Sequence, residues 1–224
     1  MQKLTKKLIF VEGNDDQEFL TKLCKKLTTE SVLATIIEPI IDQIATENGK
    51  GGDGGFKSYK YINTTLTSIV KKFTDESQDF TIDLFLVRDA DDNFQSCQDS
   101  TQELINKINN DFPEITNISY YIFPDNENKG MLETFLMEII EEDKSDAVVN
   151  CVKNFADCIE SIQPKTTNLP KLKMISYLYA SMKQQNIARA FKSSKSDILK
   201  NKIFSSQSMA LKKLEAALIK FLNA

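Results

Sequence analysis

The chain has 224 residues, of which 41% are hydrophobic and 27% charged, and its formal net charge is −4. This composition is typical of a globular protein that buries a core, in one large domain or in a domain with an appendage. The absence of histidine excludes Ser-His-Asp and Cys-His catalysis and histidine–zinc sites, which leaves carboxylates, lysine or metal-activated water for hydrolysis at neutral pH.

The start of the chain is predicted to form a βαβ unit. Apolar runs predict strands over residues 7–11 and 32–37, and apolar residues at helical spacing predict a helix over residues 15–27. Residues 47–55 then hold five of the seven glycines, before a helical stretch over 56–73. This glycine cluster is interpreted either as a flexible loop or as backbone that approaches a phosphate, and no P-loop pattern accompanies it.

The alternation of strands and helices continues to about residue 141. Residues 82–87 are apolar enough for a central strand, and helices are expected over 100–110 and 131–141, with a strand over 118–123 between them. The fold class is therefore α/β, with a parallel-rich sheet of about four strands flanked by helices.

From about Ser145 onward the pattern predicts only amphipathic helices, interrupted at Pro164 and Pro170. The chain is accordingly divided into a sheet domain over residues 1–144 and a helical C-terminal segment over residues 145–224, packed on it.

The two parts of the chain differ in charge. Residues 1–150 hold 15 lysine and arginine residues against 28 acidic ones, whereas residues 151–224 hold 13 against 4. The basic segment either pairs with the acidic part or binds a polyanion. In the second case the candidate nucleic-acid contacts are the lysines in this segment, Lys173, Lys192, Lys195 and Lys202.

Cysteine spacing and hydropathy favour a cytoplasmic protein without a membrane span. The four cysteines lack zinc-ligand spacing and are expected to be free thiols. No apolar run approaches the roughly 20 residues that cross a bilayer.

Acidic residues follow two of the predicted strands. Glu12 ends the first strand, with Asp16 four residues later, and Asp89 and Asp91 end the strand over 82–87. The carboxyl ends of parallel strands share one edge of a sheet, so these carboxylates are expected to meet there and to hold a hard cation such as Mg²⁺. The alternatives are helix capping for Asp15 and Asp16 and a solvated turn for Asp89 and Asp91.

Four motifs in order resemble those of a Toprim domain: VEGNDD (residues 11–16), GGDGG (51–55), VRDADDN (87–93) and FPDNENKGMLETFL (123–136). The resemblance is to the Toprim domains of the overcoming-lysogenization-defect (OLD) nucleases and to the small stand-alone Toprim proteins of the DUF3226 type. It covers nearly the whole chain.

The resemblance implies roles for particular residues. Glu12 corresponds to the catalytic and metal-binding glutamate, and Asp89 and Asp91 to the metal-binding Asp-x-Asp pair. Asp16 matches the second metal site of the OLD type, and Glu133 resembles the glutamate of its later acidic motif.

Lys171 resembles a catalytic lysine that faces the metals, although a solvated lysine is the alternative. Whether Asp91 or Asp92 faces the metal stays open.

The expected function is a Mg²⁺- or Mn²⁺-dependent nuclease that hydrolyses phosphodiester bonds, as an effector of phage defence. The alternative is a latent or non-catalytic effector controlled by a separate ATPase, because the chain lacks the ATPase domain often fused to OLD-type Toprim segments. A primase-type role is disfavoured because no zinc-binding segment is visible. The sequence leaves open whether the substrate is DNA or RNA and whether the protein forms a homodimer.

Overall fold

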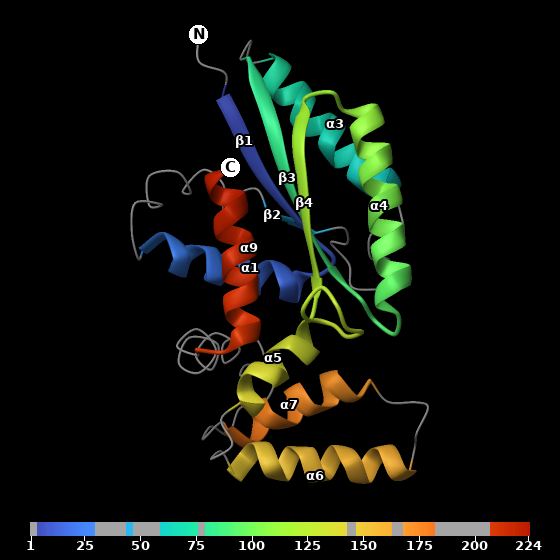
Figure 1. Cartoon of the computed structure of the whole chain (residues 1–224), viewed down its shortest axis with the longest axis vertical. Coiled ribbons are helices and arrows are strands. Elements are labelled where there is room, and N and C mark those ends of the chain that lie inside the picture. The colour runs from blue at the N-terminus through green and yellow to red at the C-terminus, as the bar shows by residue number, and fades with distance from the viewer. Residues whose placement is uncertain are drawn as a thin grey trace.

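The structure is a computed structural model of the whole chain, and it describes residues 4–29, 44–46, 59–75, 79–142, 147–162, 168–181 and 207–224. Figure 1 shows the arrangement of the elements in these ranges. The predicted strand over residues 32–37 and the glycine cluster over 51–55 lie outside them.

The centre of the fold is a four-stranded sheet in the order β2-β1-β3-β4. The strands are β1 (Leu4–Val11), β2 (Ile44–Thr46), β3 (Phe80–Asp89) and β4 (Ile115–Phe123). All neighbouring strands are parallel, which confirms the predicted α/β fold. The chain leaves β1 toward β2 on one side and returns to β3 on the other, so the topological switch point lies between β1 and β3.

One face of the sheet is covered by α1 (Asn14–Thr29), α5 (Leu132–Glu141) and α9 (Met209–Asn223). The alternate strand residues Ile9 and Val87 contribute to this core. Phe19 of α1 makes edge contacts with Phe123 of β4 and Phe135 of α5, at centroid distances of 6.4 and 5.8 Å. The aromatic rings thereby tie both helices to the sheet.

The other face is covered by α3 (Tyr59–Asp75) and α4 (Phe94–Asp111). Leu84 and Leu86 of β3 point into this second core. Every residue of β3 from Phe80 to Arg88 is buried, because a central parallel strand is covered on both sides.

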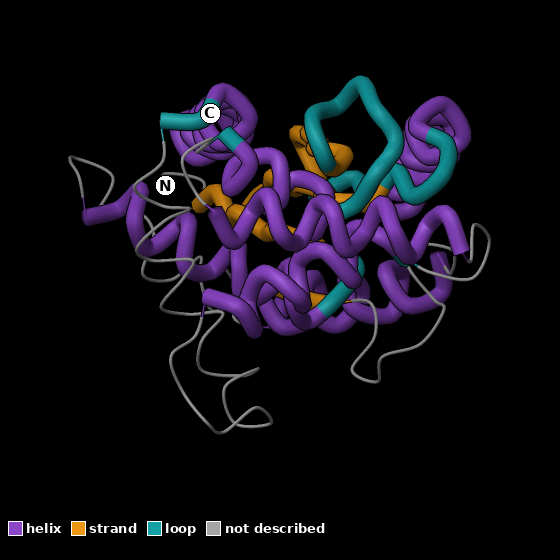
Figure 2. The backbone as a smooth tube through the Cα atoms, turned by 90° about the horizontal axis from the view of Figure 1, so that it is seen from below, coloured by secondary structure: helices purple, strands orange, loops and turns teal. Residues whose placement is uncertain are grey.

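The helices α6 (Ala147–Ile162) and α7 (Leu169–Ser181) contact each other, and α7 also contacts α5. In Figure 1 they lie with α5 beyond the lower end of the strands, and Figure 2 shows them in front of the sheet when the molecule is viewed from below. The described residues from 147 onward form only helices and their flanks, whereas the predicted domain boundary after residue 144 stays a prediction. None of the described helices has the length and apolarity that a membrane crossing requires.

Several elements begin earlier than predicted, and two elements differ most. Strand β2 lies at Ile44–Thr46, where no strand is expected from the sequence. Helix α4 begins at Phe94 instead of residue 100, because Asn93 caps it: the Asn93 side chain accepts a hydrogen bond from the Ser96 backbone N–H at 3.0 Å.

Candidate functional site

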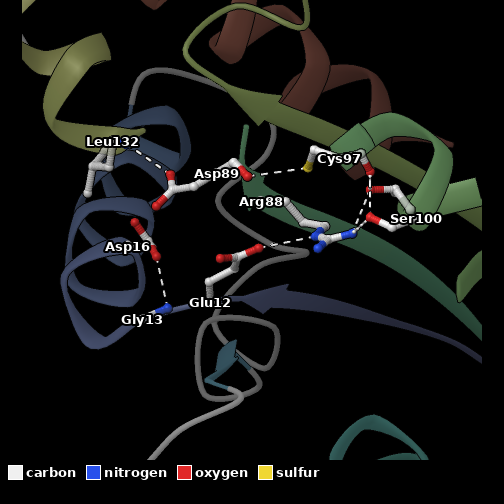
Figure 3. A network of polar contacts seen from close by, with 9 residues as sticks. Glu12, Gly13, Asp16, Arg88, Asp89, Cys97, Ser100 and Leu132 are labelled. Atoms are coloured by element: carbon white, nitrogen blue, oxygen red, sulfur yellow. Dashed lines mark hydrogen bonds and ion pairs between the residues drawn. The ribbon is translucent and has the colours of Figure 1, made fainter. Parts of the chain in front are cut away.

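Four acidic residues lie near the β1/β3 switch point and interact electrostatically. Glu12 directly follows β1, Asp89 ends β3, and Asp16 and Glu133 lie in the first turns of α1 and α5. Figure 3 shows Glu12, Asp16 and Asp89 at this edge of the sheet. Carboxylates from motifs that are far apart in the sequence therefore lie at one edge of the sheet.

Asp16 has a capping function as well as a place in the cluster. It is 7% exposed, and its Oδ2 accepts a hydrogen bond from the Gly13 backbone N–H at 2.8 Å. Gly13 is the residue before α1, so this contact is the return half of a capping box. A β-carbon at Gly13 would lie only 3.3 Å from Oδ2, which favours glycine here.

Asp89 connects the end of β3 to the start of α5. Its Oδ1 accepts a hydrogen bond from the backbone N–H of Leu132 at 3.0 Å. The Leu132 N–H is one of the donors that a helix leaves without an internal partner at its N-terminus. Asp89 thereby fixes the first turn of α5, which carries Glu133.

Burial and mutual repulsion disfavour negative charge in this cluster. Burial, followed by the charges of Glu12, Glu133 and Asp15, raises the pKa of Asp16 to about 7 despite the Gly13 hydrogen bond. Burial and the charges of Asp16, Glu12 and Glu133 raise the pKa of Asp89 well above its ordinary value. The four carboxylates therefore act on one another electrostatically, as a cation site requires.

Arg88 is a residue of this site that sequence reasoning missed. Its Nε donates to Glu12 Oε1 at 3.1 Å, and the two side chains are 8% and 16% exposed. Burial raises the pKa of Glu12, whereas the charge and hydrogen bond of Arg88 oppose this shift. The available signal was an arginine at the end of a buried apolar strand, beside a glutamate at the end of another.

Asp91 and Asp92 are exposed, whereas Asp89 is half-buried. Asp91 has a left-handed backbone conformation with φ of 50°, and its N–H donates to the Gly130 carbonyl at 2.8 Å. The charge of Asp91 raises the pKa of Glu12. Its role as a metal ligand stays a prediction.

The predicted lysines are not brought to the cluster by any described contact. Lys171 is exposed on α7, and Lys173 on the same helix is half-buried. Lys192, Lys195 and Lys202 lie outside the described residues. The roles of these lysines remain predictions.

A protein-family model matches nearly the whole chain. The family model described as "Protein of unknown function (DUF3226)" matches residues 6–223. The chain belongs to the DUF3226 family. No curated protein and no solved structure matches it.

The cluster of Glu12, Asp16, Asp89 and Glu133 has the donor chemistry that a hard divalent cation prefers, because its side chains offer only carboxylate oxygens. Asp16 and Asp89 each have one oxygen held by a backbone N–H, which orients the other. Within the described ranges, however, no three acidic or cysteine side chains already form a complete metal site. A cation would therefore have to draw the carboxylates closer together.

Proposed function

We propose that this DUF3226 protein is a metal-dependent nuclease of the Toprim type, which uses Mg²⁺ or Mn²⁺ to hydrolyse phosphodiester bonds in nucleic acid. The observation that carries the proposal is the gathering of Glu12, Asp16, Asp89 and Glu133 at the β1/β3 switch point. Ligands of open parallel sheets bind outside the carboxyl ends of the strands, at such a switch point.

The acidic side chains would have different roles in binding the cation. Asp16 is buried and Asp89 half-buried, and their backbone hydrogen bonds leave one oxygen each for a metal. Glu133 and Glu12 act on both through their charge. When bound, Mg²⁺ would stabilise the negative charge that develops on the phosphate and on the leaving oxygen.

The resemblance to Toprim motifs supports the same assignment. Glu12 and Asp89 occupy the positions of the catalytic glutamate and of the first aspartate in Asp-x-Asp. The matching DUF3226 model carries no functional description, so it neither favours nor opposes an activity. In this proposal Lys171 neutralises charge on the leaving oxygen, and the basic C-terminal lysines contact the nucleic acid.

A second candidate function is a latent effector whose activity depends on a separate ATPase. It is favoured by the incomplete metal site in the described residues. It is also favoured by Phe155 and Ile162, which are 46% and 66% exposed and lie seven residues apart on α6. A partner protein that covers these two side chains could bring the carboxylates of the site closer together.

The test is cleavage of plasmid DNA, single-stranded DNA and total tRNA by the purified protein in Mg²⁺, Mn²⁺ or EDTA. We expect cleavage only with a metal, and we expect Asp89→Asn to lose it while remaining as stable as the wild type or more stable. Asparagine keeps an oxygen for the Leu132 N–H but removes the charge that its neighbours repel. The lost activity would then reflect the site and not the fold.

Asp83→Asn is the matched control. Asp83 is another aspartate on β3 and is only 5% exposed, but it lies toward the opposite end of the strand and accepts a hydrogen bond from Thr116. Full cleavage in EDTA would contradict a metal mechanism. Unfolding of Asp89→Asn would show that Asp89 is structural.

A further inference from the structure

Arg88 lies at the end of β3 directly before Asp89 and is 7% exposed. Because successive side chains of a strand point to opposite faces, Arg88 turns toward α4 while Asp89 turns toward α5. A guanidinium stays charged even when buried, so it needs hydrogen-bond acceptors there. These acceptors are Ser100, Thr101 and Glu12.

Two hydroxyl groups of α4 hold the guanidinium. Arg88 Nη1 donates to Ser100 Oγ at 2.9 Å and to Thr101 Oγ1 at 3.0 Å. Both hydroxyls donate their own protons to the Cys97 carbonyl, at 2.9 and 2.7 Å. They therefore present only lone pairs to Arg88, and the direction of each hydrogen bond in the network is set.

The same guanidinium holds one oxygen of Glu12. Arg88 Nε donates to Glu12 Oε1 at 3.1 Å. Figure 3 shows Glu12 between Arg88 on one side and Asp16 and Asp89 on the other. The carboxylate thus faces the acidic cluster in an orientation that is fixed from α4 through Arg88.

We infer that Arg88 is a positioning residue, which is anchored on Ser100 and Thr101 and holds Glu12 in the orientation that a divalent cation at the cluster needs. This inference rests on the proposed metal-dependent function. Removing a group that hydrogen-bonds to a metal-binding side chain and orients it typically changes metal affinity or activity about 10- to 100-fold.

The charge of Arg88 alone predicts the opposite effect. A positive charge near the cluster repels a cation, so its removal would tighten metal binding if Arg88 had no positioning role. The sign of the change in affinity therefore distinguishes the two roles.

The experiment measures Mn²⁺ affinity by calorimetry for the wild type, for Arg88→Gln and for the double variant Ser100→Ala, Thr101→Val. We expect the dissociation constant to rise about tenfold or more in Arg88→Gln and about threefold in the double variant. The double variant keeps every charge, so it isolates orientation from electrostatics and decides the inference even if Arg88→Gln does not fold. Arg88→Lys should bind Mn²⁺ more tightly than Arg88→Gln, because lysine keeps a charged donor for Glu12. It should bind more weakly than the wild type, because one ammonium cannot reach Glu12 and both hydroxyls in the same geometry.

The control is Lys26→Gln. Lys26 forms an ion pair with Glu215 at 3.0 Å that joins α1 to α9, so its loss removes a link between elements without touching Glu12. We expect its Mn²⁺ affinity to equal that of the wild type. In cleavage assays Arg88→Gln should lower kcat and leave KM for nucleic acid nearly unchanged, since Arg88 contacts Glu12 and not the substrate.

Unfolding midpoints in EDTA measure stability separately. Variants that are less stable but bind Mn²⁺ as the wild type does would show a structural role and overturn the inference, as would tighter binding by Arg88→Gln. A wild type that binds no Mn²⁺ would overturn both the inference and the proposed function. A wild type that binds Mn²⁺ without cleaving nucleic acid would overturn only the proposed function, and the Mn²⁺ affinities would still decide the role of Arg88.

Discussion

Asp16 and Asp89 each use one carboxylate oxygen as a hydrogen-bond acceptor at a helix start, for Gly13 N–H and Leu132 N–H respectively. Helix capping and metal binding are therefore compatible for these residues, because a carboxylate has a second oxygen. Capping needs only an acceptor, which asparagine also provides. The negative charge, by contrast, is costly here unless a cation compensates it.

This cost predicts how stability depends on pH in EDTA. The pKa of Asp16 is about 7 in the folded protein and has its ordinary value, near 3.8, in the unfolded chain. The folded state therefore binds the proton more tightly, and this contribution to stability is present at low pH and lost as the pH rises toward 7. The raised pKa values of Asp89 and Glu12 act in the same direction.

We expect the free energy of unfolding to fall as the pH rises from about 5.5 to about 7.5, by at most about 1.4 kcal/mol per pH unit for each proton. Urea unfolding at several pH values measures it. Asp16→Asn should reduce this slope, and Mg²⁺ should restore stability at the higher pH. The lowered pKa of Asp125 acts below 3.8 and so outside this range. A stability that stays constant or rises with pH would contradict the prediction.

At the scale of elements, a buried lysine on β1 joins α9 to the sheet. Lys7 Nζ donates to the carbonyls of Phe221 and Leu222, both at 2.9 Å, in the last turn of α9. Burial lowers the pKa of Lys7, and the charge of Asp83 opposes this shift. Lys7 thus satisfies carbonyls that a helix leaves without internal partners at its C-terminus, and it complements the negative end of the helix dipole.

Lys7→Met should destabilise the protein by about 1–3 kcal/mol, because the carbonyls of α9 lose a charged donor while the aliphatic stem is kept. Amide hydrogen exchange should increase first in α9. Lys6→Met is the control, since Lys6 lies over the Phe73 ring, 4.7 Å from its centroid, in the other core. Its cost should stay below about 1 kcal/mol. If both variants changed exchange in α9 equally, Lys7 would have no specific role there.

At the scale of the whole molecule, the acidic site and the basic segment come from opposite parts of the chain. The acidic excess lies in residues 1–150 and the basic excess in residues 151–224. A basic segment that guides nucleic acid toward an acidic centre makes binding depend strongly on salt, because each neutralised phosphate releases counterions. A segment that only docks a partner protein does not affect cleavage in this way.

Charge reversal of Lys192, Lys195 and Lys202 to glutamate tests this difference. If they contact phosphates, the salt slope of nucleic-acid binding should fall by about 2–3 while Mn²⁺ affinity is unchanged. Reversal of Lys71, Lys72 and Lys107, which are exposed on α3 and α4, is the matched control. Lys171→Ala should instead slow turnover with binding nearly kept. Normal cleavage and an unchanged slope in the first triple variant would shift support to a latent effector.

The sequence alone determined the α/β class and the elements with strong local patterns. The apolar run that forms β3 and the helical spacing of Phe19 and Leu23 in α1 are local signals of burial. The grouping of Glu12 with Asp89 also followed from sequence, because residues that end neighbouring parallel strands must reach the same edge of the sheet.

Only the tertiary structure decided which polar atoms meet. The strand Ile44–Thr46 is three residues long, and its pairing with β1 gives no periodic signal in sequence. The Arg88–Glu12 pair spans 76 residues, and the Asp89–Leu132 hydrogen bond spans 43. Asp91 has a left-handed backbone conformation, its N–H donates to the Gly130 carbonyl, and it is exposed where Asp89 is half-buried. Such contacts depend on strand register and on the packing of helices against the sheet, which residue spacing along the chain does not encode.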